Sequence, residues 1–221
     1  PPPPPPPPLC NAPAPTETYT YTESSAASDV YKRQALQDKQ VIDVGCGGGL
    51  LTEGMAQRGA TVTGIDMGKT PLNVARLHQH ESNLAIDYRQ ATAEQVAQQQ
   101  PGTFDVVTCL EMLEHVPDPA VTIAACARLI NTDGYVFLST INRNPKAWLF
   151  AVVGAEYLLN MLPKGTHDYS KFIRPAEMEA WARAAGLQLV DLTGMSYNPL
   201  TQEYRLGKDV SVNYLACFRK A

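Results

Sequence analysis

The ten residues VIDVGCGGGL, from Val41 to Leu50, decide the fold predicted for this chain. An apolar run leads into an acid and then into a glycine-rich turn, which is typical of a buried parallel strand that turns into a helix. Glycines at such a turn let a ligand approach bare backbone at the carboxyl edge of the sheet. Asp66 lies 21 positions after Gly45. That spacing predicts a carboxylate that accepts hydrogen bonds from the hydroxyls of a ribose.

The spacing of the glycines indicates which nucleoside ligand would bind there. A dinucleotide fingerprint, G-x-G-x-x-G, needs a glycine where this chain has Leu50, and the pattern also fails when counted from Gly47. Asp43 precedes the turn, and a carboxylate there would repel a pyrophosphate but attract an ammonium group. S-adenosylmethionine has an ammonium group, a ribose and no phosphate. The pattern therefore favours S-adenosylmethionine over a nicotinamide or flavin dinucleotide, and over a tight turn that binds nothing.

The composition is that of a globular domain with a small negative net charge. The chain has 221 residues and a formal net charge of −4, and 44% of its residues are hydrophobic. These values argue against a general nucleic-acid-binding surface. Five scattered cysteines form no C-x-x-C pair, which indicates a reducing compartment without a disulfide framework or zinc knuckle. We expect no signal peptide and no membrane-spanning segment.

The first 34 residues differ in composition from the rest. They begin with eight consecutive prolines and continue as a tract rich in Pro, Thr, Ser and Ala. Such a tract favours polyproline II or disorder and cannot bury a core. Residues 24–34 look like translated adaptor sequence. We therefore expect residues 1–34 to be a foreign or disordered tail, with a native proline-rich interaction tail as the alternative, and residues 35–221 to form one domain.

From residue 35 onward, predicted strands alternate with predicted helices. The expected strands are 40–45, 61–66, 85–90, 104–110, 135–141, 187–195 and 211–219. The expected helices are 49–58, 70–82, 92–99, 119–130, 146–162 and 175–185. This alternation predicts a Rossmann-like α/β fold, with a seven-stranded, mostly parallel sheet and helices on both faces. Because no helix is expected between the last two strands, the last strand should run antiparallel.

Several stretches carry a resemblance to a known family. The most specific are FDVVTCLEMLEHVPDP (104–119) and VVGAEYLLNMLPKGTHD (152–168), supported by STINRNPKAW (139–148), KFIRPAE (171–177) and YNPLTQEYRLG (197–207). From about Lys39 the chain resembles the O-methyltransferases of ubiquinone biosynthesis, which are class I S-adenosylmethionine-dependent methyltransferases. The resemblance implies methyl transfer to a phenolic or catechol hydroxyl of a polyprenylated ubiquinone precursor, at both O-methylation steps. Family members carry a helical segment before the first strand, where this chain has the proline-rich tract.

Three candidate catalytic residues, Glu111, Glu114 and His115, follow the fourth predicted strand. Open α/β sheets place their chemistry at such strand ends, and on a helical turn all three side chains would share one face. Two carboxylates and an imidazole suit a divalent cation such as Mg²⁺ or Zn²⁺ that would bind the catecholate. The resemblance supports this expectation because related members depend on a metal. Alternatively His115 is a metal-free general base, or only closes a turn, with both glutamates in solvent.

The expected cofactor site combines the glycine turn with the ends of neighbouring strands. Its residues are Asp43, Gly45, Gly47, Asp66, Met67 and Leu110.

Residues 146–168 form an expected insertion with an apolar run from Trp148 to Leu162. The run is too short to span a bilayer. Five cations lie near it in sequence: Arg143, Lys146, Lys164, Lys171 and Arg174. A long apolar surface edged with cations is typical of attachment to anionic phospholipid. We therefore expect a cytoplasmic protein that is peripheral at the inner face of the membrane; a lid helix or a dimer contact is the alternative.

Two further functions remain open. The chain could be a cofactor-binding but inactive scaffold that assembles with other quinone-biosynthesis proteins. It could also be a C-methyltransferase of the same pathway, although the EMLEH run (111–115) favours the O-methylating type.

Overall fold

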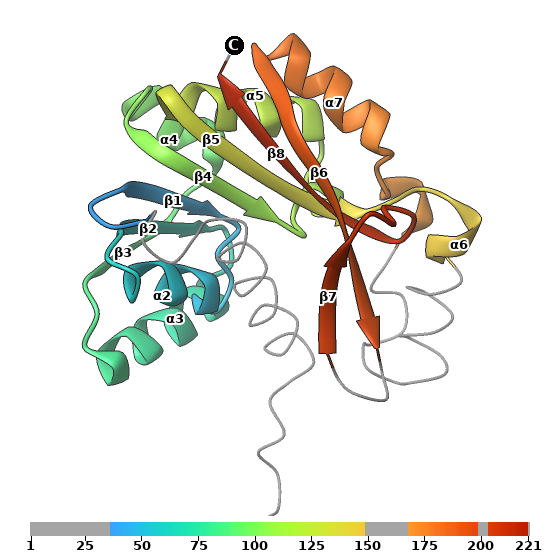
Figure 1. Cartoon of the computed structure of the whole chain (residues 1–221). Helices are drawn as coiled ribbons and strands as arrows, with labels where there is room; N and C mark the ends of the chain where they lie inside the picture. The colour runs from blue at the N-terminus through green and yellow to red at the C-terminus, as the bar shows by residue number, and fades with distance from the viewer. Residues whose placement is uncertain (1–35, 149–167, 199–202, 221) are drawn as a thin grey trace, which may run out of the picture.

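The computed structural model describes residues 36–148, 168–198 and 203–220. Within them one eight-stranded sheet, in the order β3-β2-β1-β4-β5-β8-β6-β7, carries helices on both faces (Figure 1). The proline-rich tail and most of the expected insertion, residues 149–167, lie outside the described residues. No helix among the described residues has the length and apolar character needed to cross a membrane.

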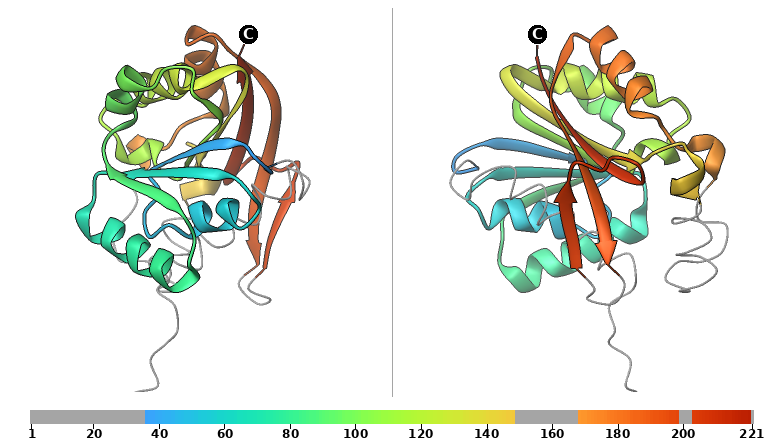
Figure 2. Two further views of the ribbon diagram at one scale, coloured as in Figure 1. Left: turned by 90° about the vertical axis from the view of Figure 1, so that its left-hand side faces the viewer. Right: turned by 45° about the vertical axis from the view of Figure 1, so that its right-hand side comes forward.

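The sheet has a parallel part and an antiparallel part. The parallel strands are β1 (Gln40–Val44), β2 (Thr61–Asp66), β3 (Ile86–Gln90), β4 (Phe104–Leu110) and β5 (Ile130–Ile141). The remaining strands are β6 (Leu187–Asn198), β7 (Glu203–Gly207) and β8 (Asn213–Lys220). Strand β8 is antiparallel to both β5 and β6, and β7 is antiparallel to β6. Figure 2 shows the β6–β7 hairpin extending beyond the body of the sheet.

Helices cover the two faces in two groups. The helices are α2 (Leu50–Ala56), α3 (Lys69–Ser82), α4 (Ala93–Gln99), α5 (Pro119–Leu129), α6 (Pro145–Trp148) and α7 (Pro175–Ala184), with 3₁₀ turns η1 (Leu113–His115) and η3 (Tyr169–Lys171). Helices α2 and α3 pack on one face through Leu51 and Leu72. Helices α4, α5 and α7 pack on the other through Val96, Ile123 and Met178. The central strands of the sheet are therefore buried on both faces, as their apolar sequences require.

Helix starts agree with the local sequence signals. Thr92 accepts a hydrogen bond from the backbone N–H of Gln95, whose side chain bonds back to Thr92, so α4 begins with a capping box. Asp118 Oδ1 accepts two backbone N–H groups of the first turn of α5, and Pro119 occupies the first helical position. These caps fix where each helix leaves the carboxyl edge of the sheet.

The predicted Rossmann-like fold is confirmed, as is the antiparallel last strand, but the predicted number of strands is wrong by one. Residues 203–207 were expected in a connection and instead form β7. The turn residues Asn198, Pro199 and Gly207 indicated a loop; the structure pairs Asn198 with Glu203 and Gly194 with Gly207. Turn residues therefore flank a hairpin strand here and do not exclude one.

Strand β5 also begins earlier than predicted. Ile130 pairs with Phe104, and the next pair is Tyr135 with Val106, so the four residues 131–134 form an irregularity inside the strand. The run Asn-Thr-Asp-Gly is typical of a turn, which explains why the prediction placed the strand start at 135.

A matched pair of glycines tests the packing of the β6–β7 hairpin. Gly194 and Gly207 are register partners. A Cβ on Gly194 would lie 1.9 Å from the backbone oxygen of Asp209, whereas one on Gly207 would meet nothing within 4 Å. We expect Gly194→Ala to lower the free energy of unfolding by about 2 kcal/mol through overpacking, and Gly207→Ala to change it by less than about 0.5 kcal/mol. Urea unfolding measures both; equal losses would contradict this packing.

Candidate active site

The glycine turn between β1 and α2 is tied to the end of β2. The backbone N–H groups of Gly45 and Cys46 both donate to the carbonyl oxygen of Ile65, at 2.8 and 3.0 Å. Gly45, Gly47 and Gly49 have positive φ angles of 79°, 53° and 86°. Residues with a Cβ atom rarely adopt a backbone conformation with positive φ, so the turn requires glycine at these positions. A Cβ on Gly47 would meet no protein atom within 4 Å, so that part of the turn faces open space.

Asp66 joins this turn to the start of α3. Its Oδ2 accepts the N–H of Gly47 at 3.0 Å, and its Oδ1 accepts the N–H of Gly68 at 2.6 Å. Each carboxylate oxygen can accept a second hydrogen bond, and the side chain is only half-buried. The carboxylate is therefore fixed in place with acceptor capacity left for the hydroxyls of a ligand.

Asp43 lies buried beneath the turn, with 3% of its surface exposed. Its Oδ1 accepts a hydrogen bond of 2.7 Å from the hydroxyl of Thr108. Burial raises the pKa of Asp43 to about 7, the Thr108 hydrogen bond opposes that rise, and the negative charge of Asp66 adds to it. A cation brought close to Asp43 would favour its ionised form.

The other two expected cofactor residues lie at strand ends. Leu110 is buried at the end of β4, and Met67 is 58% exposed just after β2. A third residue, Met112, was not predicted: a Cβ on Gly45 would lie 2.5 Å from Met112 Cγ. Met112 therefore packs directly on the glycine turn. No sequence signal identified it, since its conformation depends on the unusual backbone of the preceding residue, described next.

The loop after β4 separates the two predicted glutamates. Glu111 has a positive φ of 48°, and its Oε1 accepts a hydrogen bond of 2.8 Å from Ser139 Oγ. Glu114 is buried, and its Oε2 accepts a hydrogen bond of 2.8 Å from Thr140 Oγ1. Consecutive residues of a strand point to opposite faces of the sheet. Ser139 and Thr140 therefore hold the two carboxylates on opposite faces.

The expectation that Glu111, Glu114 and His115 share one helical face is consequently wrong. Only Leu113–His115 form a helical turn, and it is a 3₁₀ turn, in which adjacent side chains diverge. Glu114 is buried and His115 is exposed. Across the described part of the chain, no group of three or more His, Cys, Asp and Glu residues is placed to hold a metal ion. The predicted Mg²⁺ or Zn²⁺ ligand set does not fit this arrangement.

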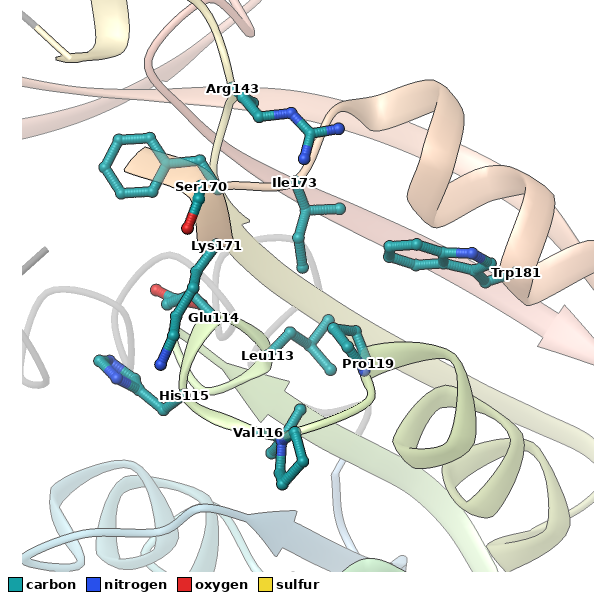
Figure 3. Close-up of a pocket in the computed structure, with 12 residues that line it drawn as sticks. Leu113, Glu114, His115, Val116, Pro119, Arg143, Ser170, Lys171, Ile173 and Trp181 are labelled. Atoms are coloured by element: carbon teal, nitrogen blue, oxygen red, sulfur yellow. The ribbon is translucent and has the colours of Figure 1, made fainter. Parts of the chain in front are cut away.

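A cavity of about 390 Å³ lies between η1, the end of β5, η3 and α7. Leu113, Ile173 and Trp181 give it an apolar wall, and His115 and Lys171 extend toward one another at its other end (Figure 3). Arg143 also lines the cavity, but it is ion-paired with Glu177 of α7. The cavity thus combines a flat aromatic surface with an imidazole and an ammonium group.

Comparison with known proteins decides the family. A methyltransferase domain model matches residues 19–192. The ubiquinone biosynthesis O-methyltransferase of Pseudomonas aeruginosa strain LESB58 is 67% identical over 184 residues, which are 83% of this chain and 79% of that protein. This chain belongs to the ubiquinone biosynthesis O-methyltransferases. The member from Pseudomonas syringae pv. tomato is 65% identical over the same shares of the two chains. The predicted family and the predicted S-adenosylmethionine-dependent enzyme class are therefore confirmed.

Solved structures agree on the fold of this O-methyltransferase. Magnesium protoporphyrin IX methyltransferase from Synechocystis PCC 6803 with bound SAH superposes with a TM-score of 0.68 at 20% identity, covering 92% of this chain and 84% of that chain. The cyclase SpnF superposes with a TM-score of 0.65 at 15% identity, covering 89% and 81%. A cyclase among these structures shows that the fold does not determine the chemistry.

The pKa of Asp43 predicts a pH dependence of stability. Because the pKa rises from 3.8 to about 7 on folding, the folded chain retains a proton that the unfolded chain loses between about pH 4 and pH 7. The contribution of this group to stability is therefore full below about pH 4 and is lost as the pH rises through about 7. Asp43→Asn keeps the acceptor for Thr108 but does not titrate. We expect urea unfolding to show a smaller loss of stability across this range in the variant, and identical pH profiles would contradict a buried, titrating Asp43.

Proposed function

We propose that this O-methyltransferase transfers the methyl group of S-adenosylmethionine to a phenolic or catechol hydroxyl of a polyprenylated ubiquinone precursor, at both O-methylation steps of the pathway. The observation that carries the proposal is the 67% identity with the ubiquinone biosynthesis O-methyltransferase of Pseudomonas aeruginosa. The open glycine turn is the proposed place for the cofactor, and the cavity between η1, η3 and α7 is the proposed place for the acceptor. A C-methyltransferase or an inactive scaffold would need the same cofactor-binding site. The product formed from the acceptor therefore distinguishes these two functions from O-methyl transfer.

In this proposal the cofactor lies along the glycine turn. Its ribose hydroxyls donate to Asp66, whose oxygens keep spare lone pairs. Its ammonium group lies near Asp43, and the carboxyl group of Asp43 ionises when this ammonium group binds. The backbone of Gly45 and Gly47 allows close approach. Met67 and Leu110 would border the adenine or the methionine part.

The acceptor ring would occupy the cavity of about 390 Å³. The attacking oxygen forms a bond to the methyl carbon, the carbon–sulfur bond breaks, and its electron pair stays on sulfur. A phenolic hydroxyl has a pKa of about 10, so the proton must leave as the oxygen attacks. His115 is the proposed general base that accepts this proton. The ammonium group of Lys171, which extends toward His115 (Figure 3), would favour loss of this proton by stabilising the phenolate form of the acceptor.

No step of this proposal passes through a metal ion, because Glu111, Glu114 and His115 do not face a common point. Attachment to anionic phospholipid and assembly with other quinone-biosynthesis proteins also remain proposals. Much of the segment expected to meet the membrane lies at 149–167, outside the described residues. Of the cations expected there, Lys146 is paired with Asp209 at 2.7 Å, which leaves it less available to a lipid headgroup.

Turnover on a short-tailed demethylubiquinol tests the function and the role of His115. We expect the purified protein to methylate this acceptor, and His115→Ala to lower kcat by roughly a hundredfold or more, the usual contribution of a general base. His80→Ala is the matched control, because His80 is also exposed but lies on α3. Absence of turnover in the wild type would contradict the proposed function. Unchanged kcat in His115→Ala would exclude His115 as the base.

Cofactor titration tests the role of Asp66. Asp66→Asn retains its size but loses its charge and one acceptor, so we expect the affinity for S-adenosylmethionine to fall by about 1–3 kcal/mol. Asp87→Asn, at an exposed position of β3, should leave the affinity unchanged. Calorimetry of both variants with S-adenosylmethionine and with NAD gives the comparison. Equal or tighter binding of NAD by the wild type would overturn the cofactor assignment.

A further inference from the structure

Ser139 and Thr140 are adjacent hydroxyl residues at the carboxyl end of β5, hereafter the hydroxyl pair. They are 2% and 0% exposed, and the strand that precedes them is apolar, with Phe137 and Leu138 in the core. Buried hydroxyl groups need hydrogen-bond partners. Here the partners are the two carboxylates of the loop after β4, so the hydroxyl pair determines where that loop lies.

Ser139 holds the first part of the loop. Its Oγ donates to Glu111 Oε1 at 2.8 Å and accepts a hydrogen bond of 3.0 Å from the backbone N–H of Glu111. That N–H also donates to the carbonyl oxygen of Ser139 at 3.2 Å. Glu111 has a φ of 48°, which is a left-handed backbone conformation that residues with a Cβ rarely adopt. These contacts keep Glu111 in that conformation, and the chain then places Met112 against Gly45.

Thr140 holds the second part of the loop from the opposite face. Its Oγ1 donates to Glu114 Oε2 at 2.8 Å, and both side chains are buried. Glu114 lines the cavity proposed for the acceptor, as does the neighbouring His115. Leu113, on the other side of Glu114, is fully buried. The Thr140 hydrogen bond therefore anchors η1, from which His115 extends.

We propose that the hydroxyl pair positions the reaction: Ser139 fixes the loop where it meets the cofactor, and Thr140 fixes it where it meets the acceptor. The inference rests on the proposed function. Because the two side chains point to opposite faces of the sheet, loss of each hydroxyl should affect a different substrate. A small displacement of a reacting group strongly lowers the rate of an in-line transfer. Loss of either hydroxyl should therefore change the binding or kinetic constants of the enzyme.

The test measures cofactor affinity and acceptor kinetics separately. We expect Ser139→Ala to weaken S-adenosylmethionine binding by about tenfold, the equivalent of one lost hydrogen bond to a charged group, with the KM for the acceptor little changed. We expect Thr140→Val to lower kcat/KM for the acceptor by about tenfold and to leave the cofactor affinity within about twofold. Thr140→Ser, which keeps the hydroxyl, should recover most of the loss.

Thr122→Val is the matched control. Thr122 is buried on α5 and donates to Glu94 at 2.9 Å, so its loss removes a similar hydrogen bond away from the loop. It should reduce stability and change neither kinetic parameter. If Ser139→Ala and Thr140→Val change both parameters alike, or neither, or if Thr122→Val has the same effect, the inference is overturned.

Failure of the proposed function is distinguishable from failure of the inference. Wild-type protein that binds the cofactor but methylates no catechol contradicts the proposed function alone. In that case the affinities of Ser139→Ala and Thr140→Val for S-adenosylmethionine still test the inference. The inference predicts weaker binding in Ser139→Ala only, and equal affinities in the two variants would contradict it.

Discussion

The carboxylate of Asp66 organises the cofactor end of this sheet. It accepts the N–H groups of Gly47, which follows β1, and of Gly68, which follows β2. Two further hydrogen bonds, from Gly45 and Cys46 to the carbonyl of Ile65, tie the glycine turn to the end of β2. A charged acceptor that holds two backbone donors is also fixed in orientation. The proposed ribose site is therefore built by the same contacts that close the fold.

The pleat of β5 provides a second constraint on the site. Adjacent strand residues point to opposite faces, so Ser139 and Thr140 hold Glu111 and Glu114 on opposite faces of the sheet. Met112, next to Glu111, packs against Gly45 of the glycine turn, and Glu114 lines the proposed acceptor cavity. The loop that connects the two glutamates consequently lies between both proposed substrates. The same geometry explains why the two carboxylates form no metal site. This chain shares its fold with a cyclase, and its proposed methyl-transfer chemistry depends on His115 of η1 and Lys171 of η3.

The sequence predicts the parts of this arrangement that depend on local patterns. The glycine turn, Asp66 and the caps at Thr92 and Asp118 follow from residue types at fixed spacing. The position of Glu114 does not, because its partner Thr140 lies 26 residues away. The left-handed backbone of Glu111 is equally hidden, since no glycine marks it. One signal was available: hydroxyl residues inside buried apolar strands, such as Thr108 and the hydroxyl pair, need polar partners.

The position of the transferred methyl group tests the central claim most directly. Purified protein would be incubated with S-adenosylmethionine carrying a ¹³C-labelled methyl group and a short-tailed demethylubiquinol, and the product examined by NMR. The account predicts a single labelled methoxy group on the acceptor oxygen, with the demethylated cofactor as the other product. Label on a ring carbon, or cofactor binding without any transfer to the acceptor, would contradict it.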